Sequence, residues 1–464
     1  MGPGPRFSHS EVLAATGARS QGAPSAPFEG VSTDSRTLSP GSLFVALRGE
    51  RFDGHRFLAE VAAAGGRGAV VQAGHPRAQG PVNWPLYEVF DTLGALGALG
   101  RFHRRRFAIP LGAVGGSNGK TTTKEMVGSI LAVRGPALKT EGNLNNEVGV
   151  PLTLLRLQPE HVAAVVELGM NHAGEMARLT ALAEPSAGLL TSIQPEHVEH
   201  LGSLEGVAAA EGELFAGLGP GATAVVNLDD AHIVGQAARA RGPRLTFGTA
   251  PAAEVRLVGV TPRGRSGLTL ALTHAGRPFE VQLGFLGRHN ALNATGAFAL
   301  GLALGYRPEE CKQGLEAARP YARRLNVVET PEGWTVLDDC YNANPASMRA
   351  ALETARTLAG DGRVVAVLGD MLELGPGELE EHAALGREAA QRAEVAAFFG
   401  PRSARGQAAA GALESAHFDS IEPLWEWLRP RLRRGDVVLV KGSRGMRLER
   451  VVEKLTGVAA SGGH

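Results

Sequence analysis

Apolar residues along the chain gather in short runs that alternate with longer amphipathic segments. The run LFVAL within residues 41–49 predicts a strand, and residues 56–73 predict a helix, a glycine turn and a second strand. Three later runs, in 162–169, 187–193 and 223–229, are apolar throughout and end in polar residues. Strands buried on both faces of a parallel sheet have this pattern. The pattern therefore predicts an α/β fold.

Changes in the pattern divide the chain into three expected domains. Residues 1–108 mix short strands and helices, and the basic segment at their end, 101–110, is expected to be a solvated linker. Residues 109–318 repeat a strand–loop–helix order, and the alternating stretch 254–286 predicts an antiparallel edge. Residues 319–464 contain four more apolar runs ending in Gly, Asp or Lys, which predict a second doubly wound domain of the dinucleotide-fold, Rossmann-like type.

Composition narrows the class of protein. The 47 basic residues balance the 47 acidic ones, so nothing at the level of the whole chain indicates nucleic acid or an anionic membrane as a partner. No apolar run approaches the roughly 20 residues that a spanning helix needs, and the first residues lack the apolar stretch of a signal peptide. We expect a cytoplasmic monomer without membrane insertion. Cys311 and Cys340 are expected to be separate buried thiols, because two cysteines make neither a disulfide framework nor a zinc site.

Lysine is rare in this chain. Only six of the 47 basic residues are lysines, and the others are arginines. A lysine kept against this preference indicates a position that needs a compact ammonium group, although chance retention is the alternative for any one of them. The six are Lys120, Lys124, Lys139, Lys312, Lys441 and Lys454.

Residues 115–126, GGSNGKTTTKEM, form a candidate phosphate loop between a predicted strand and a predicted helix. N–H groups at a helix N-terminus attract phosphate oxygens. Lys120 is expected to reach the β and γ phosphates, and the Thr121 hydroxyl to bind Mg²⁺. Val114 stands where the general P-loop pattern has glycine, so a structural turn remains an alternative. The expected nucleotide ligands are Gly116, Ser117, Asn118, Gly119, Lys120, Thr121 and Thr122.

Acidic and histidine side chains follow other strands of the same predicted sheet. Glu167 closes one apolar run, where a carboxylate can bind Mg²⁺ beside the phosphate loop, although a surface acid is an equal alternative. His197 follows the next strand. In the helix after it, Glu211 and Glu213 are two residues apart and must face different ways.

Asparagines and charged residues supply further candidates. Asparagine amides suit neutral polar groups such as peptides or a base edge, and turns or helix caps are the alternative. In the third domain, charged and polar residues at strand ends are placed to reach the crevice across a hinge near 319–325, and surface positions are the alternative. These candidates are Asn143, Asn145, Asn146, Asn290, Asn293, Arg324, Asp339, Asn342, Asn344, Lys441 and Arg444.

Together these stretches resemble the Mur ligase family over nearly the whole chain. The resemblance is carried by ELGMNHAGEM (167–176), TEGNLNNEVGVP (140–151), DDCYNANPASM (338–348), LGDMLELG (368–375) and the N-terminal STDSRTLSPGSLFVALRGERFDGHRF (32–57). The family's loop is G-x-x-G-K-T, so Val114 fits it. The resemblance implies a uridine-nucleotide domain, an ATP domain and a C-terminal ligase domain. It also implies a reaction in which ATP phosphorylates a carboxylate of UDP-N-acetylmuramoyl-tripeptide and the amine of D-alanyl-D-alanine displaces the phosphate.

The resemblance also implies roles for individual residues. Thr121 and Glu167 would hold a first Mg²⁺, and His197 would help to hold a second. Asn290 and Asn293 match positions near adenine, and Arg324 and Asp339 match positions that reach the nucleotide from the C-terminal domain. The expected substrate contacts are Ser35 and Arg36 for the uridine nucleotide, and Asn143, Asn145, Asn146, Asn342, Asn344, Lys441 and Arg444 for the peptide and the amino-acid acceptor.

Glu211 departs from the family pattern. Many members have a lysine here, carbamylated by CO₂ so that it becomes an anion near magnesium, whereas this chain reads AEGELF. We expect Glu211 to be catalytic and to support the second Mg²⁺ through water, with activity independent of bicarbonate. A solvated helix acid is the alternative.

Other functions remain to be weighed. The family member that acts one step earlier, and adds a diamino acid to the dipeptide intermediate, would have D-Y-A-H-x-P in place of YNANP. A folylpolyglutamate synthetase would not explain the N-terminal stretch 34–49. A P-loop GTPase switch would need an N-K-x-D guanine reader, which the sequence lacks, and would leave the third domain unexplained.

Overall fold

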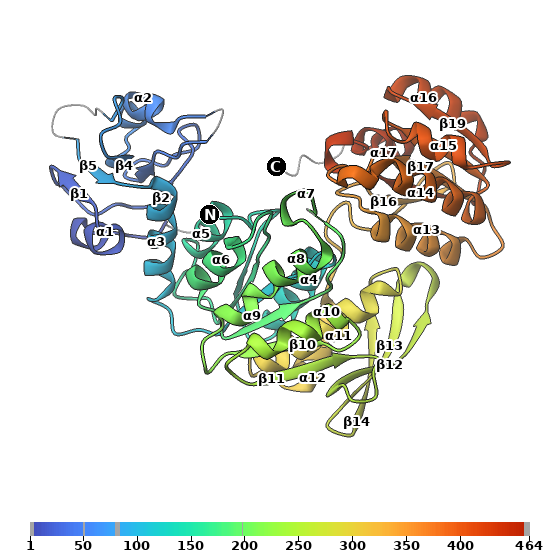
Figure 1. The fold of residues 1–464 in the computed structure, drawn as a ribbon, viewed down its shortest axis with the longest axis horizontal. Helices are drawn as coiled ribbons and strands as arrows, with labels where there is room; N and C mark the ends of the chain where they lie inside the picture. Colours follow the sequence, from blue (N-terminus) through green and yellow to red (C-terminus); the bar gives the residue numbers. More distant parts are fainter. Residues whose placement is uncertain (1–3, 50–51, 79–83, 197, 459–464) are drawn as a thin grey trace.

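The computed structural model describes residues 4–49, 52–78, 84–196 and 198–458. Three sheets of five, nine and six strands follow one another along the chain. Figure 1 shows the N-terminal and C-terminal domains standing apart on the two ends of the central domain. The predicted α/β fold of three domains is therefore confirmed. No helix among the described residues is both long and apolar enough to cross a membrane.

The N-terminal domain contains a five-stranded sheet in the order β1-β5-β4-β3-β2, antiparallel only between β1 and β5. The predicted strand, helix and strand of 41–73 are present as β3, α2 and β4. The elements are α1 (His9–Thr16), β1 (Arg19–Gln21), β2 (Val31–Ser32), β3 (Leu43–Val45), α2 (Leu58–Ala63), β4 (Gly68–Gln72), β5 (Leu86–Val89) and α3 (Thr92–Arg104).

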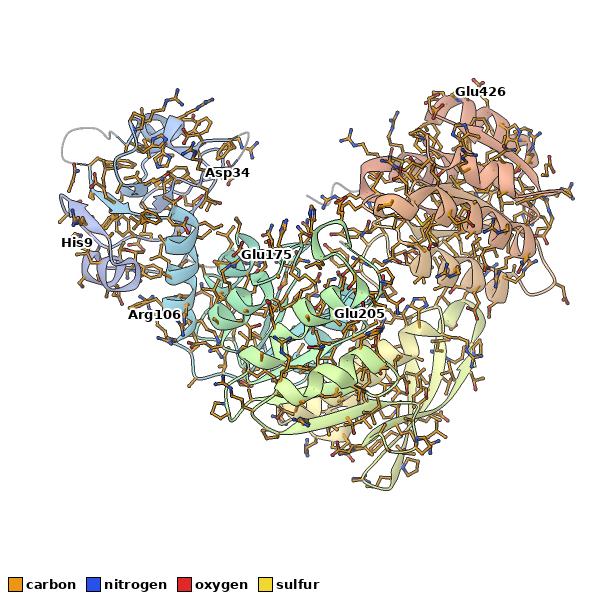
Figure 2. The ribbon with its side chains drawn as sticks, in the orientation of Figure 1. His9, Asp34, Arg106, Glu175, Glu205 and Glu426 are labelled. Atoms are coloured by element: carbon orange, nitrogen blue, oxygen red, sulfur yellow. The ribbon has the colours of Figure 1, made fainter. Side chains whose placement is uncertain are left out.

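The segment 101–110 is an anchor, and the prediction of a solvated linker was wrong. Arg104 is only 7% exposed, and its guanidinium donates to the carbonyl oxygens of Phe107 and Ile109. Arg101 and Arg105 both pair with Glu184 of the central domain, at 2.7 and 2.5 Å. The basic residues therefore fasten α3 to the central domain. Figure 2 shows Arg106 at the base of the N-terminal domain, where it pairs with Glu11.

The central domain is built on a nine-stranded sheet in the order β14-β13-β12-β11-β10-β9-β6-β8-β7. The strands from β7 to β12 are parallel, and β12, β13 and β14 form the antiparallel edge that the alternation predicted. The strands are β6 (Leu111–Gly115), β7 (Ala137–Lys139), β8 (Ala163–Glu167), β9 (Ala187–Leu190), β10 (Thr223–Asn227), β11 (Arg244–Gly248), β12 (Val255–Pro262), β13 (Leu268–His274) and β14 (Arg277–Leu283). The helices are α4 (Lys120–Leu131), α5 (Gly149–Leu154), α6 (Glu175–Ala183), α7 (Val198–Leu201), α8 (Leu204–Glu211), α9 (Glu213–Gly217), α10 (Ala231–Gln236), α11 (His289–Ala303) and α12 (Pro308–Ala317).

The central sheet is covered on both faces. One apolar cluster joins α4, α11 and α12 to the sheet, and another joins it to α6, α8 and α9. The short runs of β6, β8 and β9 are buried along their full length, as a parallel strand between two helical layers requires. Their carboxyl ends meet at one edge, which places the loops after them side by side.

The C-terminal domain has a six-stranded sheet in the order β15-β16-β20-β17-β18-β19, parallel except for β15. The last strand, β20, lies between β16 and β17, so its loop joins theirs at one edge. Both cysteines are buried and free, as predicted. The elements are β15 (Asn326–Glu329), β16 (Thr335–Asp339), α13 (Pro345–Ala359), β17 (Val364–Gly369), α14 (Glu378–Arg392), β18 (Val395–Phe399), α15 (Ala404–Ala409), β19 (Glu414–Phe418), α16 (Ile421–Leu428), β20 (Val437–Lys441) and α17 (Glu449–Thr456).

Candidate active site

The phosphate loop turns from β6 into α4 at Gly119. This residue has φ +84°, and a Cβ atom on it would lie 2.4 Å from Oδ1 of Asn293. Only glycine meets both conditions without strain. The first N–H groups of α4 have no carbonyl partner within the helix and are available to an anion.

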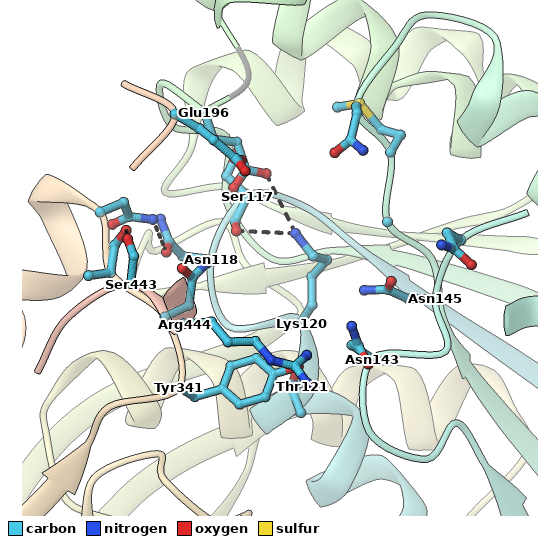
Figure 3. A pocket seen from close by; sticks show the side chains of 18 of the residues that line it. Ser117, Asn118, Lys120, Thr121, Asn143, Asn145, Glu196, Tyr341, Ser443 and Arg444 are labelled. Carbon is cyan, nitrogen blue, oxygen red and sulfur yellow. Dashed lines mark hydrogen bonds and ion pairs between the residues drawn. The ribbon is translucent and has the colours of Figure 1, made fainter. Parts of the chain in front are cut away.

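Lys120 points into the cleft from the first residue of α4. Its ammonium donates to the carbonyl oxygens of Gly116 at 2.5 Å and Ser117 at 3.2 Å, and it lies 3.5 Å from Oε1 of Glu196 (Figure 3). Burial alone would lower the pKa of Lys120, but the carboxylates of Glu196, Glu211 and Glu167 outweigh it and the pKa is raised. The side chain is therefore a charged ammonium that lines the cleft.

The segment after β9 holds the loop from the opposite side. Ser192 accepts the Ser117 N–H on its carbonyl oxygen at 2.7 Å and the Asn118 N–H on its hydroxyl at 3.3 Å. The Ser117 hydroxyl donates to the carbonyl of Gln194 at 3.1 Å. These bonds hold the loop against the segment after β9. Glu196 is carried by the same segment, so its place beside Lys120 follows from the same bonds.

Glu167 ends β8 as predicted and is 2% exposed. Its Oε1 accepts the Asn145 amide at 2.9 Å, and its N–H donates to the Thr140 hydroxyl at 3.0 Å. Its Oε2 is buried without a hydrogen-bond partner among the described residues and lies 3.9 Å from the ammonium of Lys124. A buried carboxylate oxygen with no donor, in a cleft also lined by Thr121, fits a hard divalent cation such as Mg²⁺.

Two side chains of the C-terminal domain reach the loop directly. Arg324 donates to the Thr121 hydroxyl at 3.0 Å, and the Asn344 amide donates to Oδ1 of Asn118 at 2.7 Å. The Arg324 guanidinium lies over the ring of Tyr341, 4.3 Å from its centre. These contacts carry polar groups across the hinge to the phosphate loop.

Asp339 and Lys441 end the neighbouring strands β16 and β20 and pair with each other at 2.7 Å. Lys441 also donates to the carbonyl of Asn342 at 2.9 Å, and Asp339 accepts the N–H of Leu325 at 3.2 Å. In this conformation the pair braces the loop after β16 against the hinge.

A cleft of about 660 Å³ between the central and C-terminal domains contains most of the predicted residues. Those that line it are Ser117, Asn118, Gly119, Lys120, Thr121, Asn143, Asn145, Asn146, Glu167, Arg324, Asn342, Asn344, Lys441 and Arg444.

Other predicted residues lie elsewhere. Asn290 and Asn293 are on α11 behind the loop, where the Asn293 amide donates to the Asn290 amide oxygen at 2.9 Å. Ser35 and Arg36 belong to the N-terminal domain, after β2. Arg36 pairs with Asp34 at 2.7 Å and holds the pKa of that carboxyl down to about 2. Figure 2 shows Asp34 on the edge of the N-terminal domain nearest the C-terminal domain in this view. His197 lies outside the described residues.

Glu211 lies directly beneath the loop. It is 1% exposed, and its Oε2 accepts the Gly116 N–H at 2.8 Å. Burial raises the pKa of its carboxyl to about 7, although the charge of Lys120 opposes this. Glu211 is therefore not a solvated helix acid. Glu213 faces away, as predicted, and accepts the N–H groups of Gly174 and Ala177 at the start of α6.

The sequence analysis gave no role in the site to three residues of this region. Glu196 pairs with Lys120, Tyr341 supports Arg324, and Lys124 is fully buried beside Glu167. The rarity of lysine was a usable signal for Lys124. Glu196 had no such signal, because it is one of several acids in its stretch.

A second cluster, in the N-terminal domain, brings together Asp53, His55 and His75. Both imidazoles lie against the Asp53 carboxylate, and their other nitrogens face the backbone N–H groups of Gln72 and Arg77. Each ring therefore keeps its proton on the nitrogen nearest Asp53. One nitrogen of each ring accepts a backbone N–H and the other faces Asp53, at 2.8 Å for His55 and 3.4 Å for His75, so these contacts account for the cluster without a metal ion.

The chain is similar to known proteins over almost its full length. Residues 27–104 match the family model "Mur ligase family, catalytic domain", 114–301 match "Mur ligase middle domain", and 323–444 match "Mur ligase, glutamate ligase domain". Two proteins named UDP-N-acetylmuramoyl-tripeptide--D-alanyl-D-alanine ligase are similar to it. The one from Bacillus subtilis (strain 168) is 34% identical, over 92% of this chain and 93% of its own length. The one from Escherichia coli (strain K12) is 38% identical, over 92% of this chain and 94% of its own length.

Solved structures agree with the sequence relatives. A crystal structure of MurF from Acinetobacter baumannii aligns with a TM-score of 0.90 at 33% identity, covering 98% of this chain and all of its own. MurF ligase from Thermotoga maritima in complex with ADP aligns with a TM-score of 0.78 at 27% identity, covering 91% and 96%. The chain belongs to the Mur ligase family.

Proposed function

We propose that this chain is an ATP-dependent ligase that adds D-alanyl-D-alanine to UDP-N-acetylmuramoyl-tripeptide, a step in the synthesis of the peptidoglycan precursor. The observation that carries the proposal is the cleft between two domains, where a phosphate loop and a buried carboxylate face arginine, lysine and asparagine side chains from across a hinge. The relatives with this name, similar along more than nine-tenths of their length, supply the substrates.

The reaction has two chemical steps. A carboxylate oxygen of the tripeptide attacks the γ-phosphorus of ATP, the bond to the β-phosphate oxygen breaks, and ADP leaves. The amine of D-alanyl-D-alanine, having lost a proton, then attacks the carbonyl carbon, and phosphate leaves as the amide forms. A carboxylate is a poor acceptor for an amine in water because it lacks a good leaving group, which the phosphoryl group supplies. Catalysis of both steps is mainly positioning and charge neutralisation.

The residues around the loop have matching roles in this proposal. Lys120 and the phosphate loop, residues 116–122, bind the phosphates of ATP while the N–H of Gly116 stays on Glu211, and Arg324 neutralises charge from the other domain. Asn290, Asn293 and Asp339 serve the adenosine part. Ser35 and Arg36 bind the uridine nucleotide. The peptide and acceptor contacts are Asn143, Asn145, Asn146, Asn342, Asn344, Lys441 and Arg444.

Mg²⁺ is proposed as the cofactor, held by Thr121 and Glu167, with His197 as a ligand of a second ion. When bound, it neutralises the oxygens of the transferring phosphoryl group. The support in this chain is the buried Oε2 of Glu167, which has no hydrogen-bond donor among the described neighbours. Both nucleotide substrates belong to cytoplasmic pools, so we also propose the cytoplasm as the place of action. A monomer remains our prediction.

The test is release of phosphate from ATP with each substrate added alone and then together. The proposal requires release only when UDP-N-acetylmuramoyl-tripeptide and D-alanyl-D-alanine are both present, with the amide product in equal amount. Turnover with the dipeptide precursor and a diamino acid would instead identify the preceding ligase. Steady GTP hydrolysis without either substrate would identify a nucleotide switch.

A further inference from the structure

The buried carboxylate of Glu211 touches the phosphate loop at its first turn. Oε2 of Glu211 accepts the Gly116 N–H at 2.8 Å. A Cβ atom on Gly115 would lie 3.1 Å from the same oxygen. A side chain at residue 115 would therefore press on this carboxylate, which would have to shift by a few tenths of an ångström.

Gly116 is held from several sides. It has φ +111°, and a Cβ atom on it would lie 2.4 Å from the hydroxyl oxygen of Thr191. Its N–H is bound by Glu211, and its carbonyl oxygen accepts the Lys120 ammonium at 2.5 Å. Gly116 thus lies between the carboxyl group of Glu211 and the ammonium of Lys120.

These two contacts differ in what nucleotide binding does to them. In the proposed function Lys120 turns toward the phosphates of ATP, which releases the Gly116 carbonyl. The Glu211 carboxylate does not line the cleft and has no reason to move. It is the contact that still holds Gly116 when Lys120 has left.

We propose that Glu211 is a positioning residue, which keeps the phosphate loop in its phosphate-binding conformation through the Gly116 N–H. It does so as an unmodified carboxylate and acts on the loop rather than on a metal ion. The inference rests on the proposed function only in requiring that the loop bind a nucleotide.

The test separates the loop from the metal. Binding of ADP is measured by calorimetry in EDTA, and binding of Mn²⁺ to the enzyme–ADP complex by electron paramagnetic resonance. In Glu211→Ala the metal-free affinity for ADP should fall by roughly tenfold or more, because the Gly116 N–H loses its hydrogen-bond acceptor. In Glu211→Gln, whose amide oxygen can still accept the Gly116 N–H, it should stay within about threefold. The number of Mn²⁺ ions bound per ADP should be unchanged in both.

Two controls keep the outcome decisive. Glu213→Ala removes a neighbouring carboxylate that serves α6 and should leave ADP affinity unchanged. If Glu211→Ala does not fold, Gly115→Ala places a Cβ atom 3.1 Å from Oε2 of Glu211 and 3.0 Å from Cδ2 of Leu190, and it should weaken metal-free ADP binding in the same direction. The wild type should turn over equally with and without bicarbonate.

The inference is overturned if Glu211→Ala binds ADP normally in EDTA, or if Glu211→Gln loses a Mn²⁺ ion while its ADP affinity is unchanged. Either result with a wild type that requires both substrates for turnover removes only this inference. A wild type that shows no such requirement removes the proposed function instead.

Discussion

Lys124 offers the sharpest test of how the site is held together. It is fully buried on α4, and its ammonium donates to the Thr140 carbonyl at 2.7 Å. It lies 3.0 Å from a carboxylate oxygen of Glu125 and 3.9 Å from Oε2 of Glu167. The other oxygen of Glu125 pairs with Lys139, so two ammonium groups balance two carboxylates. Lys124→Met keeps an unbranched side chain, one atom shorter, and removes its charge.

The expected cost is large because the partners cannot reach water. Removing one member of a buried pair generally destabilises a protein by about 3–5 kcal/mol, since the remaining charge stays buried without compensation. Lys139 offers the matched control. Its side chain is 45% exposed and pairs with the same Glu125, so Lys139→Met should cost only about 0–1 kcal/mol.

The assay must report on the central domain. The four tryptophans are Trp84, Trp334, Trp425 and Trp427, all outside residues 109–318, so their fluorescence does not follow this unfolding directly. Hydrogen exchange of the amides in α4 and β8 does. Lys124→Met should raise their exchange far more than Lys139→Met, and the added change Glu125→Gln should recover part of the loss. If Lys124→Met is no less stable than Lys139→Met, the buried pairing does not stabilise the domain and the reasoning fails.

Three further predictions concern the loop and its neighbours. The pKa of Glu211, which lies among the charges of Lys120, Glu196 and Glu213, is raised from 4.5 to about 7, so the folded protein binds more protons than the unfolded one between these values. The free energy of unfolding should therefore fall by on the order of 3 kcal/mol as pH rises through this window. Denaturant unfolding at a series of pH values should show this fall in the wild type and a flatter dependence in Glu211→Gln. Gly119→Ala should abolish ATP turnover through the clash of its Cβ atom with Asn293. The control Gly305→Ala should leave turnover intact, because Gly305 has a similar φ of +85° but a Cβ atom on it would meet nothing within 4 Å. Equal activities of the two variants would contradict the steric argument. Arg324→Ala should lower kcat/KM for ATP by roughly a hundredfold in steady-state kinetics. Arg324→Lys should be similarly impaired, because an ammonium lacks the planar guanidinium that stacks on Tyr341. Normal kcat/KM in Arg324→Lys would refute a stacking role.

The fold was predictable because strands buried on both faces of a parallel sheet are continuous apolar runs that can be found in the sequence. Runs such as AAVVE and VVLVK have four apolar residues followed by one charged residue, which stands where the strand leaves the sheet. The same feature located Glu167 and Lys441, since the carboxyl ends of parallel strands share an edge. The position of the loop was predictable because G-x-x-G-K-T stands between a predicted strand and a predicted helix.

The remaining features depend on contacts between residues far apart in the chain. Nothing near Arg104 indicated that its guanidinium would be buried against carbonyl oxygens, because a basic helix end has the composition of a surface. Helical spacing separated Glu211 from Glu213 but could not say which of them faces Gly116. The pairing of Lys120 with Glu196 joins segments that only the order of the strands brings together. The roles of single site residues therefore stay predictions.

The contacts between the domains use atoms that are proposed to bind the nucleotide and its metal ion. The Thr121 hydroxyl, proposed as a metal ligand, accepts Arg324, which is proposed to neutralise phosphate. In the proposed function, Thr121 exchanges Arg324 for the metal ion and Arg324 exchanges Thr121 for phosphate. Binding of ATP therefore requires that the hydrogen bond between these two residues break. Arg323 and Leu325, on either side of Arg324, have φ of +62° and +52°, a backbone conformation that costs non-glycine residues about 1 kcal/mol or more. Because the hinge holds Arg324 in place at this cost, closure around ATP is expected to be an exchange of partners about that residue.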